Sequence, residues 1–299
     1  MMTNPDPNLP VASVGPDVPP ELLAATGRSA GPLGWNIDRE FPRAAQWLES
    51  KYPRWAFSIV EDWASGALDH LGAVVFSRAD DAAQRLYYYL CELRRRGAVA
   101  GPQPLILDIA RIGRPSSEGR CIEAVRHLAG QLGVADDALE TAIAVAPASP
   151  PAVSTVGNVC LLAGTPAPDR RLHDAVAANG WTAVGETLAE IWARCPAPAE
   201  AGTSDPCAAL GRRMHAQSSG PRAFFDRGAK LVEQARAANA QAVVLWYAEE
   251  DEADVWHLPT QKRALAEAGI PALVLTRRDW RANDGAAEEI AVFLKEQGA

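Results

Sequence analysis

Acidic side chains gather directly after two apolar stretches that have the length of buried strands. The candidates are Asp80 and Asp81 after the stretch 71–77, and Glu249, Glu250 and Asp251 after the stretch 242–247. In doubly wound sheets, ligands bind outside the carboxyl ends of the strands. Carboxylates at such a place bind hard cations or transfer protons. The same residue types are also common in the first turn of a helix, where the helix dipole favours negative charge.

The cysteines of the chain match no common metal or redox motif. They are Cys91, Cys121, Cys160, Cys195 and Cys207. Because no CxxC pair occurs among them, the sequence motifs of zinc ribbons, ferredoxins and thioredoxins are excluded. Cys195 and Cys207 flank a stretch rich in proline, glycine and serine (195–206) and are weak candidates for metal ligands. The other three fall within predicted helices or a strand, where free cysteine usually packs in the core.

Composition excludes several classes of protein. Hydrophobic residues make up 48% of the chain and charged residues 22%, which is an ordinary globular balance. The longest apolar runs are far shorter than the roughly 18 residues of a membrane span. A formal net charge of -8 argues against nucleic acid as the main partner, because such binding needs many cations. The first residues lack the basic and apolar regions of a secretory signal, so we expect a cytoplasmic protein.

Strand-like and helix-like stretches alternate along the chain, which is typical of βα units on a parallel sheet. The proline-rich residues 147–157 interrupt this alternation and resemble an interdomain linker. We therefore predict a flexible tail over 1–17, an N-terminal α/β domain over 18–146 and a C-terminal α/β domain over 158–299. Both domains should have mainly parallel sheets with helices on both faces.

The pattern also predicts individual elements. Strands are expected at 71–77, 104–109, 158–163, 182–185, 242–247 and 271–276. Helices are expected at 80–96, 116–133, 136–145, 168–179, 221–239, 254–268 and 286–297. Before these, a short helix over 19–27, an amphipathic helix over 38–51 and a short buried strand over 55–60 are expected, and 195–206 should be a loop.

Motifs for nucleotide binding and for a serine nucleophile find no support. The sequence has neither a GxGxxG after a predicted strand nor a GxxxxGK[ST]. Gly27–Gly31 fits GxSxG formally, but that motif exposes its serine on a strand-to-helix turn. Here a short predicted helix precedes Ser29 and Pro32 follows, so we interpret the match as chance.

Several stretches together resemble the 2-hydroxyacyl-CoA dehydratase family, which includes benzoyl-CoA reductase subunits. They are Val18–Gly27 (VPPELLAATG), Ala73–Ser77 (AVVFS), Asp80–Asp81, Arg85–Leu90 (RLYYYL), Gln131–Gly133, Leu139, Ala142–Ile143, Leu161–Gly164, Leu172–His173, Gly180, Asp205–Pro206, Pro221–Arg222 and Ala266–Leu275 (AEAGIPALVL). Their order and spacing carry the resemblance, which covers roughly residues 18–297.

The resemblance implies two flavodoxin-like domains and a heterodimer of related subunits. In the family, each catalytic subunit binds a [4Fe–4S] cluster between its two domains, and an ATP-driven activator injects one electron. The dehydratases then eliminate water from a 2-hydroxyacyl-CoA through a ketyl radical.

The family places cysteines near three spots, and this chain has none there. The spots correspond to Trp55–Asp62, to Ala79 and to Ala248–Asp251. Cluster irons need thiolate ligands, so we expect no cofactor; a [4Fe–4S] cluster with unusual ligands is the alternative.

The expected function is that of a cluster-free subunit of a dehydratase-like or reductase-like complex. It would assist acyl-CoA binding or a cysteine-bearing partner, with Arg78 and Arg222 as candidates for contacting the CoA. Two alternatives stay open: an active [4Fe–4S] enzyme with non-standard ligands, and a scaffold or small-molecule-binding module without chemistry. An active form would be a lyase or an aryl-CoA reductase subunit.

Overall fold

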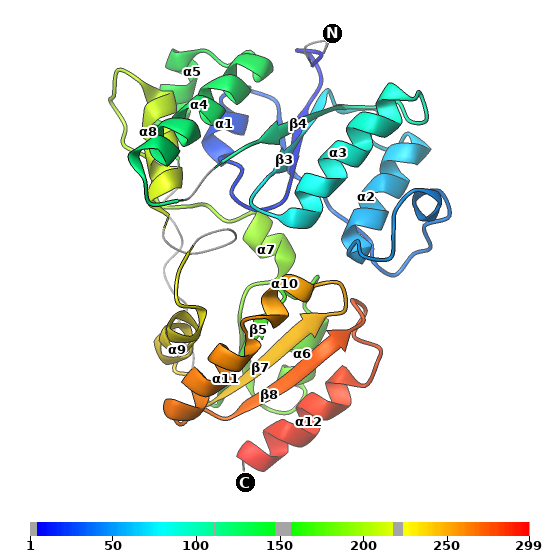
Figure 1. Cartoon of the computed structure of the whole chain (residues 1–299), viewed down its shortest axis with the longest axis vertical. Coiled ribbons are helices and arrows are strands. Elements are labelled where there is room, and N and C mark those ends of the chain that lie inside the picture. The colour runs from blue at the N-terminus through cyan, green and yellow to red at the C-terminus, as the bar shows by residue number, and fades with distance from the viewer. Residues whose placement is uncertain (1–4, 110–111, 147–156, 218–223, 299) are drawn as a thin grey trace. The chain divides into compact units, whose positions relative to one another are not determined.

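The computed structural model describes residues 5–109, 112–146, 157–217 and 224–298. The chain forms two compact units, which are coloured by residue number in Figure 1. The first consists of Met1–Pro150 and Trp192–Phe224, and the second of Pro151–Ile191 and Phe225–Ala299. Each unit contains one four-stranded, all-parallel sheet.

The first unit has strand order β2-β1-β3-β4. Its strands are β1 (Val11–Val14), β2 (Ser29–Pro32), β3 (Ala73–Ser77) and β4 (Gln103–Leu107). Its helices are α1 (Pro20–Ala24), α2 (Arg54–Ser65), α3 (Asp81–Arg95), α4 (Pro115–Leu132), α5 (Asp136–Ala144) and α8 (Pro206–Ala216), with a 3-10 turn at Ala44–Gln46.

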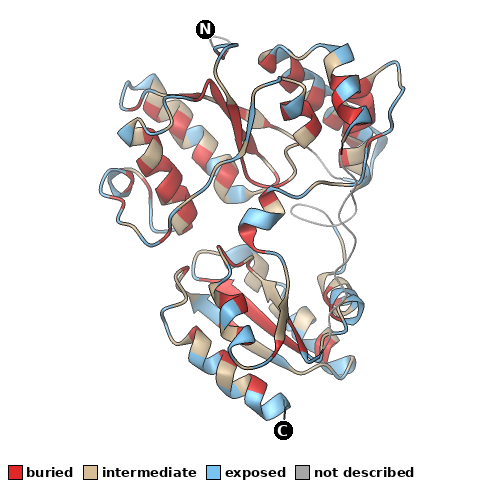
Figure 2. Cartoon of the chain, turned by 180° about the vertical axis from the view of Figure 1, so that it is seen from behind, coloured by how far each residue is buried: buried red, intermediate tan, exposed pale blue. Residues whose placement is uncertain are grey.

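Helices cover both faces of this first sheet. On one face, alternate residues of the strands, such as Val75 and Leu105, share a core with Leu128 of α4 and Leu210 of α8. On the other face, Phe76 of β3 contacts the ring of Trp63 in α2 and that of Tyr87 in α3. All five residues of β3 are buried, as expected for a parallel strand covered on both sides (Figure 2).

The second unit repeats the plan with strand order β6-β5-β7-β8. Its strands are β5 (Val159–Gly164), β6 (Thr182–Val184), β7 (Ala242–Ala248) and β8 (Ala272–Arg278). Its helices are α6 (Arg171–Ala177), α9 (Arg227–Ala237), α10 (Glu252–Val255), α11 (Leu258–Glu267) and α12 (Ala286–Gln297), and α7 (Leu188–Trp192) ends at the first residue of the returning segment of unit one. Helices α9 and α11 pack on one face of the sheet, and α6 and α12 contact its strands from the other.

The predicted fold class is therefore confirmed: the chain is an α/β protein with two flavodoxin-like units. None of the helices within the described ranges is long and apolar enough to cross a membrane.

The N-terminal prediction is wrong in its detail. Residues 11–14 fall in the predicted flexible tail, yet they form the buried inner strand β1. Four residues are too few to show a period, and the flanking prolines and polar residues concealed them. Residues 55–60, predicted as a strand, lie in α2. There Trp55, Ile59 and Trp63 recur at helical spacing, and Gly66 ends the helix with a left-handed φ of 80°.

Two other predictions also differ from the structure. Of the predicted helix 38–51, only a 3-10 turn at Ala44–Gln46 forms. Its position after the predicted linker places the segment Trp192–Phe224 in the predicted C-terminal domain, but the segment belongs to the first unit. Helix α8 within it was not predicted. Apart from Gly157, the predicted linker 147–157 lies outside the described residues.

Candidate functional site

The strand order of each sheet defines one place where a ligand site is expected. In the second unit, the chain passes from β5 to β6 on one side and later returns to β7 on the other side of β5. Crevices at such switch points, outside the carboxyl ends of the strands, are where doubly wound proteins bind ligands. The residues that follow β5 and β7 are thus the first candidates in this unit.

Thr165 and Asp251 join the ends of β5 and β7. The Thr165 hydroxyl donates to a carboxylate oxygen of Asp251 at 2.5 Å and accepts the backbone N–H of Ala248 at 3.1 Å. Asp251 also accepts the backbone N–H of Asp254 at 3.3 Å and so caps α10. Burial, followed by the charge of nearby Asp254, raises the pKa of Asp251.

Glu250 points to a different partner. Its carboxylate accepts the indole N–H of Trp280 at 2.8 Å, and the Trp280 ring packs edge-on against Trp246 with centroids 5.9 Å apart. Burial is the main cause that raises the pKa of Glu250, with the charges of Glu249 and Asp279 adding to it. A desolvated carboxyl of this kind keeps its proton to higher pH than usual and is chemically able to act as a proton donor.

Glu249 is the exposed member of the acidic run. It forms an ion pair with Arg277 at 3.1 Å, and both side chains are largely solvent-accessible. The three predicted carboxylates therefore have three separate partners. Among the described residues, no three histidine, cysteine, aspartate or glutamate side chains gather in a way that could hold a metal ion.

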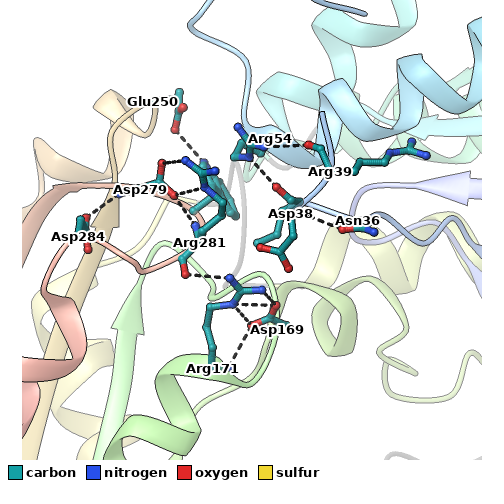
Figure 3. A network of polar contacts seen from close by, with 12 residues as sticks. Asn36, Asp38, Arg39, Arg54, Asp169, Arg171, Glu250, Asp279, Arg281 and Asp284 are labelled. Carbon is teal, nitrogen blue, oxygen red and sulfur yellow. Dashed lines mark hydrogen bonds and ion pairs between the residues drawn. The ribbon is translucent and has the colours of Figure 1, made fainter. Parts of the chain in front are cut away.

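A second polar network ties the loop after β5 to the loop after β8 (Figure 3). The Arg171 guanidinium binds Asp169 through two nitrogens, at 2.8 and 2.7 Å, and donates to the backbone carbonyl of Arg281 at 2.8 Å. Arg281 in turn donates to Asp279 at 3.1 Å. These contacts stabilise the carboxyl edge of the second sheet, because they fix loops that come from different strands.

The corresponding edge of the first unit carries cations. Arg78, directly after β3, pairs with Asp108, directly after β4, and Arg120 of α4 approaches the other oxygen of Asp108 at 3.6 Å. One carboxylate thus lies between two guanidinium groups. Asp80 accepts the backbone N–H of Ala83 at 2.7 Å and caps α3, and Asp81 lies in the first turn of that helix. Asp80 is thus the N-cap residue of α3.

Three of the five cysteines are buried in the structure. Cys121 and Cys207 are buried in the apolar core of the first unit, and Cys160 is fully buried in β5 of the second. Burial raises the pKa of Cys207, and it raises that of Cys160 to about 12, which opposes the thiolate form that iron needs. Cys91 and Cys195 are half-buried. At the family's cysteine positions lie helix α2, the buried Ala79 and the acidic run after β7.

Sequence reasoning located the ends of the strands but missed the partners. It identified Arg78 and Glu250, but not Asp108, Arg120, Thr165 or Trp280. Asp108, Thr165 and Trp280 each come within two residues of a strand end, so their positions after predicted strands are the signal that could have found them, whereas Arg120 lies inside α4. Arg222, the other cation predicted to contact CoA, lies outside the described residues.

No protein-family model matches the sequence, and no curated protein shows significant similarity to it.

Proposed function

We propose that the chain is a subunit of a complex similar to 2-hydroxyacyl-CoA dehydratases or benzoyl-CoA reductases. It holds no iron–sulfur cluster of its own and assists acyl-CoA binding or the work of a cysteine-bearing partner. The proposal derives from the resemblance of the sequence to that family.

One structural observation supports the proposal. The two units share one strand order, and in each an aspartate caps the helix after the third strand, Asp80 in one and Asp251 in the other. Two such units are the architecture that the resemblance implies. Each unit also has polar side chains at its switch point, where ligands of this fold class bind.

Two guanidinium groups at the carboxyl edge of the first sheet suggest where a CoA would bind. Phosphates favour guanidinium groups, which the first unit offers in Arg78 and Arg120 around Asp108. We therefore assign the CoA phosphates to the Arg78 and Arg120 side chains.

A thermal-shift titration tests ligand binding. Acyl-CoA thioesters of several chain types, with free CoA for comparison, should raise the melting temperature of the chain, alone or with its partner. Arg78→Ala and Arg120→Ala should each weaken that shift. Arg95→Ala is the matched control, because Arg95 also pairs with a carboxylate but lies on the outer surface of α3. If no thioester shifts the melting temperature under either condition, the scaffold alternative replaces the proposal.

Iron analysis tests the cluster-free part separately. After anaerobic reconstitution with iron and sulfide, we expect no stoichiometric iron in the purified chain. About four irons per chain, lost on Cys195→Ala or Cys207→Ala, would instead support the enzyme with unusual ligands.

A further inference from the structure

A pocket of about 340 Å³ opens at the amino ends of the strands of the first sheet. Its lining includes Gly72, directly before β3, and Gln103, the first residue of β4. Because the strands of this sheet are all parallel, the pocket lies at the edge opposite to Arg78, which directly follows β3. The pocket is therefore separate from the side chains to which we assign the CoA phosphates.

The chain before β1 forms one wall of this pocket, and hydrogen bonds fix its position. The Arg28 guanidinium donates to the backbone carbonyls of Asp6 at 3.0 Å and of Leu9 at 2.5 Å. A Cβ added to Gly72 would lie 2.9 Å from the Asp6 carbonyl oxygen and 3.1 Å from the Leu9 side chain, so this wall packs directly on the sheet edge. Leu9 and Leu71 give the pocket an apolar part beside its polar side chains.

Asp69 brings a carboxylate to the pocket. The turn after α2 fixes its position, since the Asp69 N–H donates to the Gly66 carbonyl at 3.1 Å. The carboxylate oxygens lie 3.0 and 3.1 Å from the places that a Cβ on Gly66 and on Gly101 would take, so the two glycines leave the room that it occupies. Among the described residues, none donates a hydrogen bond to this carboxylate or pairs with it. A negative charge beside the carbonyl end of a helix is unfavourable unless a cation compensates it.

Arg94, in the last turn of α3, brings a guanidinium group to the same pocket. It donates to the backbone carbonyl of Gly101 at 2.5 Å, and Gly101 also borders the Asp69 carboxylate. The two arginines that follow Arg94 pair with Glu92, whereas Arg94 has no carboxylate partner within the described ranges. A carboxylate and a guanidinium group thus border one residue of the pocket without pairing with each other.

We propose that this pocket binds a small zwitterion, namely a free amino acid with an apolar side chain. Its ammonium group binds Asp69, and its carboxylate accepts from N–H groups of Arg94, which gives one charge-assisted contact at each end. The side-chain amide of Gln103, which bonds to no described residue, can serve either group. Leu9 and Leu71 contact the apolar side chain. A simple cation would be repelled by Arg94 and a simple anion by Asp69, whereas a zwitterion compensates both charges.

Isothermal titration calorimetry of the full chain tests the proposal with L-valine and two of its analogues. Isovalerate lacks the ammonium group of valine, and isobutylamine lacks its carboxylate. We expect valine to bind and each analogue to bind at least about tenfold more weakly, because each loses one charge-assisted contact. The other apolar amino acids are titrated in the same way. If none of them binds at about 10 mM, or if isobutylamine binds as tightly as valine, the proposal is wrong.

Substitutions assign the binding to this pocket. Asp69→Asn and Arg94→Gln should each weaken the binding of valine at least about tenfold. Arg96→Gln is the matched control, because Arg96 pairs with Glu92 outside the pocket, and it should bind valine as the original chain does. Circular dichroism checks that each variant folds; if Arg94→Gln does not, Gln103→Leu takes its place. Unchanged affinity in Asp69→Asn, or an equal loss in Arg96→Gln, would overturn the proposal, and neither result depends on whether the chain binds an acyl-CoA.

Discussion

Removing the Arg213 guanidinium should destabilise the protein strongly, because it leaves a buried carboxylate without its partner. The Arg213 guanidinium of α8 binds both carboxylate oxygens of Glu21 in α1. Glu21 is 4% exposed and the Arg213 side chain 12% exposed, so neither charge is well hydrated in the folded state. Breaking a buried pair from one side typically costs about 3–5 kcal/mol. Because the Arg213 side chain remains partly accessible, we expect a cost at the lower end of this range, about 3 kcal/mol for Arg213→Met. That corresponds to roughly a 150-fold change in the unfolding equilibrium.

Urea unfolding followed by circular dichroism measures this cost, and a double-mutant cycle isolates the pair. Glu21→Met/Arg213→Met replaces both charges by apolar side chains and should recover most of the loss, to within about 1 kcal/mol of the original chain. Arg95→Met removes the cation of an exposed pair on α3 and should leave the urea midpoint unchanged. A loss below about 1 kcal/mol for Arg213→Met would refute the reasoning, because the carboxylate would then be hydrated and α8 not docked as described.

Three further predictions concern strands β5 and β7 and the residues that follow them. Gly164→Ala should cost at least about 2 kcal/mol in denaturant unfolding, because φ is +95° and the new Cβ would collide with the carbonyl oxygen of Trp246; a neutral result would contradict that geometry. Burial raises the pKa of Asp251, so its contribution to stability is full at acid pH and is lost as pH rises through the folded pKa. Asp251→Asn keeps the cap acceptor but cannot become charged. The melting temperature of the variant, relative to that of the original chain, should therefore rise between about pH 4 and pH 8. A difference that stays constant with pH would argue against the raised pKa. A thiol reagent added to the folded protein should modify Cys195 well before Cys160, because Cys160 is buried and its burial raises the pKa of its thiol to about 12. Equal rates of modification would mean that β5 opens readily.

The repeating βα units were predictable because their sequence patterns are local. Asp80 caps α3 and Gly133 ends α4 with a left-handed φ of 69°, and both residues mark these boundaries in the sequence. The strand β7 is a continuous apolar run that is buried throughout. The misassigned residues 55–60 show the limit, since apolar and aromatic residues in a short run suit a strand as well as a buried helix.

Site residues could be predicted from the sequence only where they directly follow a predicted strand. Asp251 could be chosen because it follows β7, but its hydroxyl partner Thr165 lies 86 positions away in the sequence. No local pattern contains that pairing, because the order of strands in the sheet brings the two residues together. The same holds for Glu21 and Arg213, whose contact depends on a segment that returns to a unit the chain had already left.

Because α8 comes late in the sequence, it affects how the first unit folds while the chain is being synthesised. As the chain leaves the ribosome, α4 and α5 emerge with Leu128 and Leu139 facing a place that α8 has yet to fill. Translation of the residues between α5 and α8 takes on the order of several seconds, at about 5–20 residues per second. During that interval the nascent first unit exposes an apolar face to the cell. A slow stretch of codons in Pro151–Ile191 would prolong this exposure, and the risk of aggregation, without changing a single residue of the first unit.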